Sequence, residues 1–251
     1  MRAPFEMEQQ IQQNLNQPKQ ASWRQYALLT VGSESIWGLI RHELITGLLG
    51  GFPGAVGLWL RRKAYPCLFR TCGRGLIVGK NVTLRGTGKI SIGDNVALDD
   101  GVVLDARGEH ATMELKERAL ISRNTIVRSR NGSVVIGTHA DIGANCILAT
   151  DSSLSIGDDT LVAAFCYLIA GGNHAYENPD VPIREQGFNK KGGIRVGRDV
   201  WIGSHVAVQD GASIGDGAVV GSHAMVNRDI GPLAVAWGVP AREHRKRGDR
   251  A

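Results

Sequence analysis

Aliphatic residues recur every six positions through much of the chain, and this period limits the possible folds more than any other feature of the sequence. The longest unbroken run consists of Val196, Ile202, Val208, Ile214, Val220 and Val226. Four positions after each of these stands a small or β-branched residue, for example Ala212 and Ala218. Half-buried strands repeat every two residues and helices about every 3.6, so neither pattern accounts for a period of six.

Shorter upstream runs keep this spacing, at Val78 and Leu84; Ile92, Leu98 and Leu104; Ile136, Ile142 and Leu148; and Ile156, Val162 and Leu168. Glycine is abundant, with 33 in 251 residues, and several glycines directly follow the aliphatic: Gly93, Gly137, Gly143, Gly157, Gly197, Gly203, Gly215 and Gly221. We therefore interpret each hexapeptide as one short strand and one tight corner, and three of them as one triangular coil of about 18 residues. The aliphatic side chains are predicted to point inward and to stack on those of the next coil.

The repeat also assigns positions to cysteines and histidines. Cys146 and Cys166 lie four residues after an aliphatic, at the small inward position, so we expect buried free thiols. His139, His205 and His223 lie three residues after an aliphatic and are predicted to form an outward, solvated ladder, with a metal site as the alternative. No metal cofactor is expected, because the sequence has neither a CxxC pair nor a His/Cys zinc spacing.

Two segments interrupt the period. Residues 106–119 are rich in charge and are predicted to form a surface loop with a helical turn. Residues 173–191 are predicted to form a longer loop, of a length that is uncommon in a compact domain unless it is functional. His174, near its start, comes six residues after Leu168, where the period calls for an inward aliphatic. An imidazole at the edge of a rigid coil suits a general base, and the alternative is a loop histidine bonded to backbone.

The motifs around the long loop resemble a known family. They read GGNHAY and PIREQG in the loop, KGGIRVGRDVWIGSHV after it, and IGDGAVVGSHAMVNRDI and AVAWGVPARE towards the C-terminus. The repeat closely resembles the hexapeptide-repeat family, and these motifs resemble its sugar O-acetyltransferase branch, with galactoside, maltose and capsular-sugar acetyltransferases. The resemblance implies an all-β fold, a left-handed parallel β-helix solenoid, assembled as a homotrimer with sites between subunits. It also implies that acetyl-CoA is the donor and that His174 deprotonates an acceptor hydroxyl, which attacks the thioester directly.

The resemblance further implies where the cofactor binds. The cofactor side would include Trp201, Gly203, Ser204, Ser222, Asn227, Arg228 and Arg242. On the acceptor side we expect, from the residues and not from the resemblance, Asn145, Glu177, Asp180 and Arg184. From the residues alone, Glu177 or Asp180 could orient the imidazole or be a solvated loop carboxylate, and Asn145 could pack at a corner. We expect a backbone N–H or a hydroxyl near Gly203 and Ser204 to stabilise charge on the thioester oxygen.

The chain is predicted to have three parts. Residues 1–75 would form an N-terminal arm with an apolar helical extension, residues 76–240 the β-helix, and residues 241–251 a basic tail. Within the first part, residues 1–22 are dominated by polar residues and are expected to be a mobile arm. They contain no apolar signal segment, so we expect a cytoplasmic protein.

The uncharged stretch from residue 44 to residue 60 allows two interpretations. It is shorter than the roughly 20 residues of a membrane-spanning helix, and a basic cluster follows it at Arg61, Arg62 and Lys63. One interpretation is a helical cap packed on the protein. The other is an interfacial hairpin that contacts an anionic membrane surface through residues 36–63.

The net charge of +5 is concentrated at the two ends of the chain. A basic end suits a phosphorylated cofactor or an anionic membrane better than duplex nucleic acid, for which no motif is present. The sequence therefore predicts an acetyl-CoA-dependent O-acetyltransferase that acts on a sugar hydroxyl of a surface polysaccharide or glycan precursor. Two alternatives stay open: an N-acetyltransferase for an amino-sugar, and a non-catalytic β-helix scaffold or binding protein.

Overall fold

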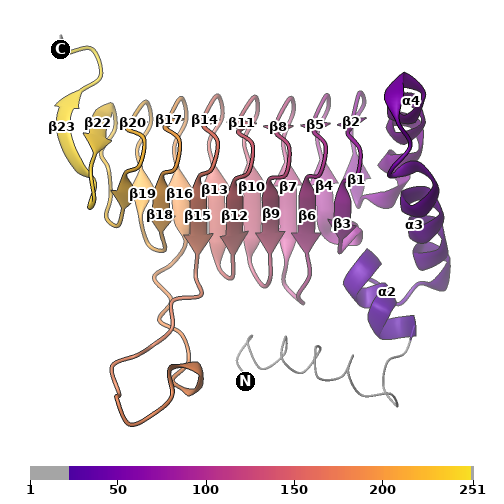
Figure 1. Ribbon diagram of the computed structural model, residues 1–251, viewed down its shortest axis with the longest axis horizontal. Helices are drawn as coiled ribbons and strands as arrows, with labels where there is room; N and C mark the ends of the chain where they lie inside the picture. Colours follow the sequence, from indigo (N-terminus) through magenta and orange to yellow (C-terminus); the bar gives the residue numbers. More distant parts are fainter. Residues whose placement is uncertain (1–22, 250–251) are drawn as a thin grey trace.

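Three parallel sheets run along the molecule and form the sides of a β-helix (Figure 1), in a computed structural model that describes residues 23–249. The first sheet contains β1 (Thr71–Cys72), β4 (Ile90–Ile92), β7 (Thr112–Leu115), β10 (Ser133–Ile136), β13 (Ser153–Ile156), β16 (Ile194–Val196) and β19 (Ser213–Ile214). The second contains β2 (Ile77–Val78), β5 (Ala97–Leu98), β8 (Leu120–Ile121), β11 (Asp141–Ile142), β14 (Leu161–Val162), β17 (Trp201–Ile202), β20 (Val219–Val220), β22 (Ala234–Trp237) and β23 (Arg242–Lys246). The third contains β3 (Thr83–Arg85), β6 (Val103–Ala106), β9 (Ile126–Ser129), β12 (Ile147–Thr150), β15 (Tyr167–Ala170), β18 (Ala207–Gln209) and β21 (Met225–Val226).

The six-residue period marks the core of the β-helix, as predicted. Every aliphatic residue of the repeat is buried, and so are the small residues four positions later, Cys146 and Cys166 included. The corners are as tight as the glycines indicated. A Cβ atom on Gly137 would lie 2.5 Å from the carbonyl carbon of Gly157 in the next coil.

The outward histidine ladder is also confirmed. His139, His205 and His223 occupy corners with positive φ and are exposed. The rings of His205 and His223 stack with a centroid distance of 4.7 Å, and Phe165 stacks on His205 from the preceding coil at 5.1 Å. Among residues 23–249, no group of three or more His, Cys, Asp or Glu is placed to hold a metal ion.

Coil length varies more than the sequence suggested. Ser133 pairs with Ser153, twenty residues further on, whereas Arg195 pairs with Ser213 after the expected 18. The coil that begins at Ser133 has four-residue strands in the first and third sheets, β10 and β12, so it needs more residues per turn.

The prediction of a surface loop with a helical turn at residues 106–119 is wrong. Thr112–Leu115 forms β7, which pairs with β4 and β10, and Met113 and Leu115 are buried. The segment is therefore a regular part of the coil, and charge within it is carried by outward positions and corners.

Helices cover the N-terminal end of the β-helix (Figure 1). They are α2 (Trp23–Val31), α3 (Ile36–Leu49), α4 (Gly54–Ala64) and the 3-10 turn η1 (Tyr65–Leu68), while a second such turn, η2 (Thr87–Lys89), lies in the first coil. Ser35 caps α3 by accepting a hydrogen bond from the N–H of Gly38 at 3.0 Å. Residues 44–60 thus belong to a helical cap that packs on the protein, the first of the two interpretations of this stretch. The arm expected at residues 1–22 lies outside the described residues.

Arg61 holds α4 in place from a buried position. Its Nε donates to the carbonyl of Val78 in β2 at 2.8 Å, and its Nη1 donates to those of Phe52 at 2.7 Å and Leu49 at 3.1 Å. One guanidinium therefore joins α4, the end of α3 and the first coil. At the other end of the molecule, residues 242–246 of the expected basic tail form β23, which pairs antiparallel with β22.

Candidate active site

The loop that carries His174 projects from the side of the coil (Figure 1). The chain leaves the coil after β15 and returns with β16. Gly193 sits at the return, where the buried Asp210 accepts the N–H groups of Lys191 and Gly193, both at 2.8 Å. This clamp fixes one side of the loop base.

His174 lies on the other side of the loop base and is half-buried. It forms an antiparallel bridge with Phe188, and the flanking Ala175 N–H donates to Gly187 O at 3.1 Å. Phe188 also packs against the imidazole, with ring centroids 4.5 Å apart. The backbone and the ring of His174 are therefore both positioned by the returning strand of the loop.

His174 does not occupy the inward place that the six-residue period would give it. The chain has already left the coil at this point, and the inward place that follows Ile156 in the first sheet belongs to Val196. His174 consequently stands outside the hydrophobic core and is not part of the coil.

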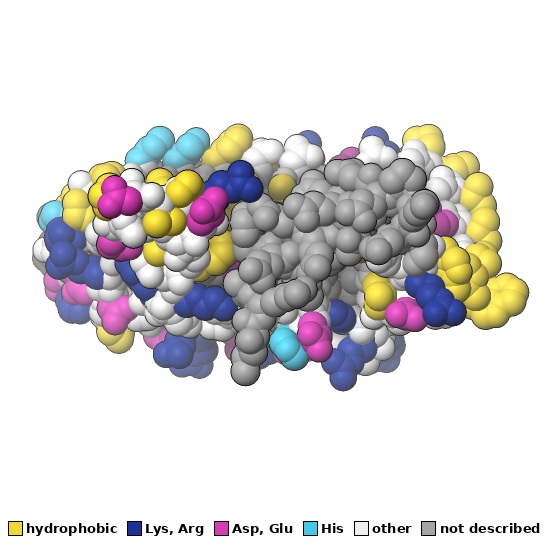
Figure 2. Space-filling model, turned by 90° about the horizontal axis from the view of Figure 1, so that it is seen from below, with side chains coloured by type: hydrophobic (Ala, Val, Ile, Leu, Met, Phe, Trp, Pro, Cys, Tyr) yellow, Lys and Arg dark blue, Asp and Glu magenta, His cyan; other side chains and the backbone are white. Residues whose placement is uncertain are grey.

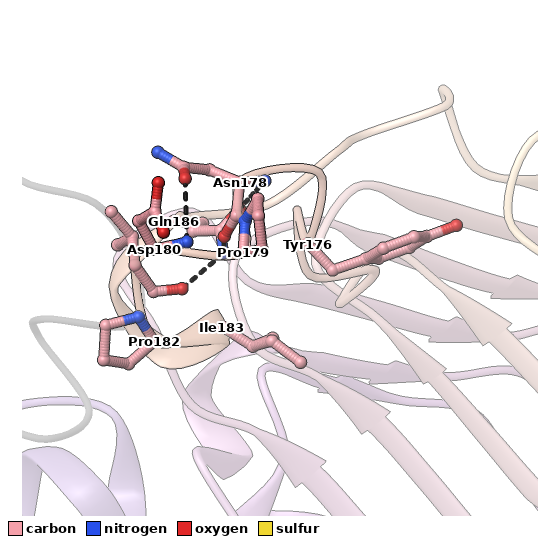
Figure 3. Close-up of a pocket in the computed structure, with 8 residues that line it drawn as sticks. Tyr176, Asn178, Pro179, Asp180, Pro182, Ile183 and Gln186 are labelled. Carbon is pink, nitrogen blue, oxygen red and sulfur yellow. Dashed lines mark hydrogen bonds between the residues drawn. The ribbon is translucent and has the colours of Figure 1, made fainter.

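The tip of the loop encloses an open hollow of about 480 Å³ (Figure 3). Gln186 ties its two sides together, because its Nε2 donates to the carbonyls of Asn178 at 2.7 Å and Val181 at 2.6 Å. Asp180 lines the hollow, whereas Arg184 lies in the exposed turn η3 (Ile183–Glu185). These contacts make the tip an ordered surface that can shape an acceptor site.

Glu177 is the predicted carboxylate nearest to His174 in sequence. It accepts a hydrogen bond from Asn189 Nδ2 at 3.4 Å, so it links the outgoing and returning strands of the loop. Asp180 instead donates its N–H to Asn178 Oδ1 at 3.0 Å. Glu177 is therefore built into the loop base, while Asp180 belongs to the tip.

The predicted cofactor residues lie along the second sheet and the corner that follows it. Trp201 is 56% exposed on the outward side of the second sheet, between Leu161 and Val219 in register. Ser204 and Ser222 occupy the same corner in adjacent coils, where the N–H of His223 donates to Ser204 O at 2.9 Å. The structure thus brings Trp201, Ser204 and Ser222 onto one continuous surface.

The polar atoms of Gly203 are already engaged, which corrects one expectation. Its N–H donates to Val220 O at 2.8 Å, and its carbonyl accepts the Cys166 thiol at 3.1 Å. The Gly203 amide therefore belongs to the ladder between coils and is not free to stabilise an oxyanion. The hydroxyl and N–H of Ser204 remain the predicted donors.

The other predicted residues are more widely spread. Asn145 is half-buried at a corner with φ of 58°, a conformation that asparagine tolerates well. Asn227 and Arg228 are exposed beside Asp229, whose pKa is lowered by the hydrogen bond it accepts from Ser213. Arg242 begins β23 and pairs with Trp237.

Comparison with known proteins places the chain in a family. The model of bacterial transferase hexapeptide repeats matches residues 193–228, and the model of the hexapeptide repeat of succinyl-transferase matches residues 133–170. A Staphylococcus aureus protein named as an acetyltransferase with no acceptor specified is 33% identical over 147 residues, which cover 52% of this chain and 70% of that protein. The chain belongs to the hexapeptide-repeat acetyltransferase family.

Two further members of the hexapeptide-repeat acetyltransferase family show how far the similarity extends. A protein of Mycobacterium tuberculosis named as a probable acetyltransferase is 35% identical over 59% of this chain and 48% of its own length. The galactoside O-acetyltransferase of Escherichia coli is 34% identical over 49% of this chain and 58% of its own length. The chain thus spans about half the length of these curated relatives.

Proposed function

We propose that this protein transfers an acetyl group from acetyl-CoA to a sugar hydroxyl, with His174 as the general base. The observation that carries the proposal is the position of His174, held by Phe188 at the base of the one long loop that leaves the coil between β1 and β21. A likeness to galactoside O-acetyltransferase supports a sugar as the acceptor.

The reaction needs a base because a sugar hydroxyl is a poor nucleophile near neutral pH. A neutral His174 takes the hydroxyl proton while the oxygen attacks the thioester carbon, an effect worth roughly 10² to 10⁴ in rate. The carbon–sulfur bond then breaks and CoA leaves as the thiol, with the proton returned by the imidazole. Ser204 supplies the hydrogen bond to the thioester oxygen. No acyl-enzyme intermediate is needed, because the acceptor oxygen attacks the thioester directly.

The donor lies on the surface that carries Trp201, Ser204 and Ser222. Arg228 and Arg242 provide the cations for the phosphates of CoA. Four large apolar side chains are exposed near this surface: Leu161, Phe165, Tyr167 and Trp201. Because an exposed patch of this kind marks an interface, a homotrimer with the site between subunits completes the proposal.

The test is acetyl transfer by a His174→Ala variant, with His110→Ala as the matched control. His110 is an exposed histidine in the corner between β6 and β7, far along the coil from the loop. We expect kcat for His174→Ala to fall by about 10² to 10⁴ while His110→Ala stays near wild type. An acceptor panel with matched hydroxyl and amino sugars separates O- from N-transfer. Full activity of His174→Ala on every acceptor would refute the assigned base.

A further inference from the structure

The outward side of the helical cap is covered with apolar side chains. Trp37 and Leu48 of α3 are 77% and 70% exposed, and Val56 and Trp59 of α4 are 60% and 58% exposed. Other exposed apolar residues on the two helices and their connection are Ile36, Ile40, Leu44, Phe52 and Leu58. This is far more apolar surface than the single scattered residues of an ordinary protein exterior.

These residues form a face, because their spacing follows the helix. Trp37, Leu44 and Leu48 are seven and four residues apart, on one side of α3. The opposite side packs on the protein through the buried residues Leu39 and His42. In α4 the buried positions are Gly57 and Arg61. The apolar residues of α4 therefore point outward while the helix itself is packed on the protein.

Figure 2 shows where the face points. Hydrophobic side chains gather along the extreme end of the molecule, on the side of the helices that faces away from the β-helix. We refer to the outward side of α3 and α4, from Trp37 to Lys63, as the cap face. It is directed along the axis of the β-helix, away from the loop and the predicted donor surface.

The charges around the cap face are basic. Arg41, Arg62 and Lys63 are exposed and make no ion pair with any residue between 23 and 249. Glu43 is the single carboxylate of α3 and α4, and it accepts a hydrogen bond from the hydroxyl of Tyr26 at 2.8 Å. His42 adds no charge at neutral pH, because burial lowers the pKa of its imidazole.

We propose that the cap face docks on an anionic lipid bilayer. Its aliphatic residues enter the boundary between headgroups and acyl chains, Trp37 and Trp59 lie at headgroup level, and Arg41, Arg62 and Lys63 bind lipid phosphates. Within residues 23–249 no helix is long and apolar enough to cross a bilayer, so the contact is interfacial. The axis of the β-helix then points away from the membrane, and α3 and α4 lie between the β-helix and the bilayer. This proposal does not depend on the acetyl-transfer chemistry.

Two features favour a bilayer over a protein partner. The basic residues border an apolar centre that contains two tryptophans, which is the arrangement of interfacial helices. The cap face also has cations at the C-terminal end of α4, next to its apolar residues. The apolar residues can contact acyl chains while the cations contact lipid headgroups.

The experiment measures partition of the full-length protein onto two kinds of vesicle, phosphatidylcholine alone and phosphatidylcholine with about 30% phosphatidylglycerol. The anionic phosphatidylglycerol supplies the negative surface that attracts basic residues. A Trp37→Ser, Leu48→Ser and Val56→Ser triple variant tests the apolar centre, and Arg62→Glu with Lys63→Glu tests the cations. Val239→Ser is the control, since Val239 is 70% exposed and lies between β22 and β23, which Figure 1 shows at the opposite end of the molecule from the helices.

We expect wild type to bind the anionic vesicles. The triple variant should bind them at least about 100-fold more weakly, because it loses three side chains that the bilayer would bury. The charge variant should bind about tenfold or more weakly, with a smaller dependence on salt, and Val239→Ser should bind like wild type. Circular dichroism and an unchanged Tm establish that the variants are folded. Equal binding by the triple variant would overturn the proposal. So would a wild type that ignores vesicles and instead self-associates through the cap face in sedimentation.

Discussion

Gly137 shows at a single position how closely adjacent coils approach each other. A Cβ atom there would lie 2.5 Å from Gly157 C and 2.6 Å from Asp158 N, both backbone atoms that cannot move without disturbing the ladder between coils. Gly47 offers the contrast, since a Cβ on this exposed helical residue would meet nothing within 4 Å. The same substitution should thus have opposite effects at the two positions.

We predict that Gly137→Ala lowers the free energy of unfolding by about 2 kcal/mol or more, as overpacking does, and that Gly47→Ala raises it by about 0.5 to 1 kcal/mol through helix propensity. Urea unfolding followed by circular dichroism measures both. Equal stability of Gly137→Ala and wild type would mean that the corners can open.

Residues of the repeat were predictable because each inward position is constrained by the coils above and below it. Val196 to Val226, Cys146 and Cys166 all lie where the period placed them. The place of His174 was not predictable in the same way. The six-residue period would give His174 the inward place of the first sheet. In the structure that place belongs to Val196, which pairs with Ile156 after the loop.

The donors at the predicted oxyanion site illustrate a second limit at this scale. The sequence indicates that Gly203 is at a corner, but it does not show that Val220 O takes its N–H. Phe188 and Asp210, which fix the loop base, were also missed. A large aromatic residue in a polar loop and an aspartate ahead of a glycine corner were the available signals.

Among the elements, α4 depends most on one side chain. Arg61 is 2% exposed, and its guanidinium donates to the carbonyls of Val78, Phe52 and Leu49. Of these, Leu49 O also accepts the backbone N–H of Phe52, at 3.2 Å. Replacement by an apolar residue leaves these carbonyls buried without that donor, which costs about 1 to 3 kcal/mol for each group that water cannot reach.

We predict that Arg61→Met lowers the free energy of unfolding by about 3 kcal/mol, whereas Arg62→Met, at the exposed neighbouring position, changes it by less than about 0.5 kcal/mol. Hydrogen exchange should show that α4 loses protection first. If both variants unfold alike, the guanidinium is not what fastens the cap.

The strand β7 shows which elements sequence reasoning misses. Leu115, Ile121 and Val127 keep the six-residue spacing, but the extra residues of the coil break the phase with Leu104 and Ile136. Because residues 106–119 are also rich in charged side chains, the sequence favoured a surface loop there. The helical cap was easier to predict, and its apolar outward side is the surface that the proposed membrane contact would use.

The whole molecule, as proposed, is one third of a trimer. Leu161 is exposed on the second sheet with Trp201 as its neighbour in register, whereas Ser155 occupies the outward side of the first sheet. A carboxylate at the first position would disrupt the proposed subunit interface, and one at the second would stay in solvent.

We predict that Leu161→Glu sediments as a monomer and loses stabilisation by acetyl-CoA, while Ser155→Glu remains a trimer. At about 100 times the dissociation constant, acetyl-CoA should stabilise wild type by about 2.7 kcal/mol, measured as a rise in Tm. Absence of any rise for wild type would favour a non-catalytic scaffold. A stabilised Leu161→Glu monomer would place the donor site within one subunit.

The loop at 173–191 is inserted at a corner, and the pairing of strands continues past it: β13 pairs with β16 and β15 with β18 as if nothing intervened. Closing a flexible loop costs only slightly more as it lengthens. The loop can therefore change in length or sequence without altering the pairing of the coils on either side of it. If the loop does bind the acceptor as proposed, a loop of different sequence grafted at this single corner would test a new acceptor specificity on an unchanged β-helix.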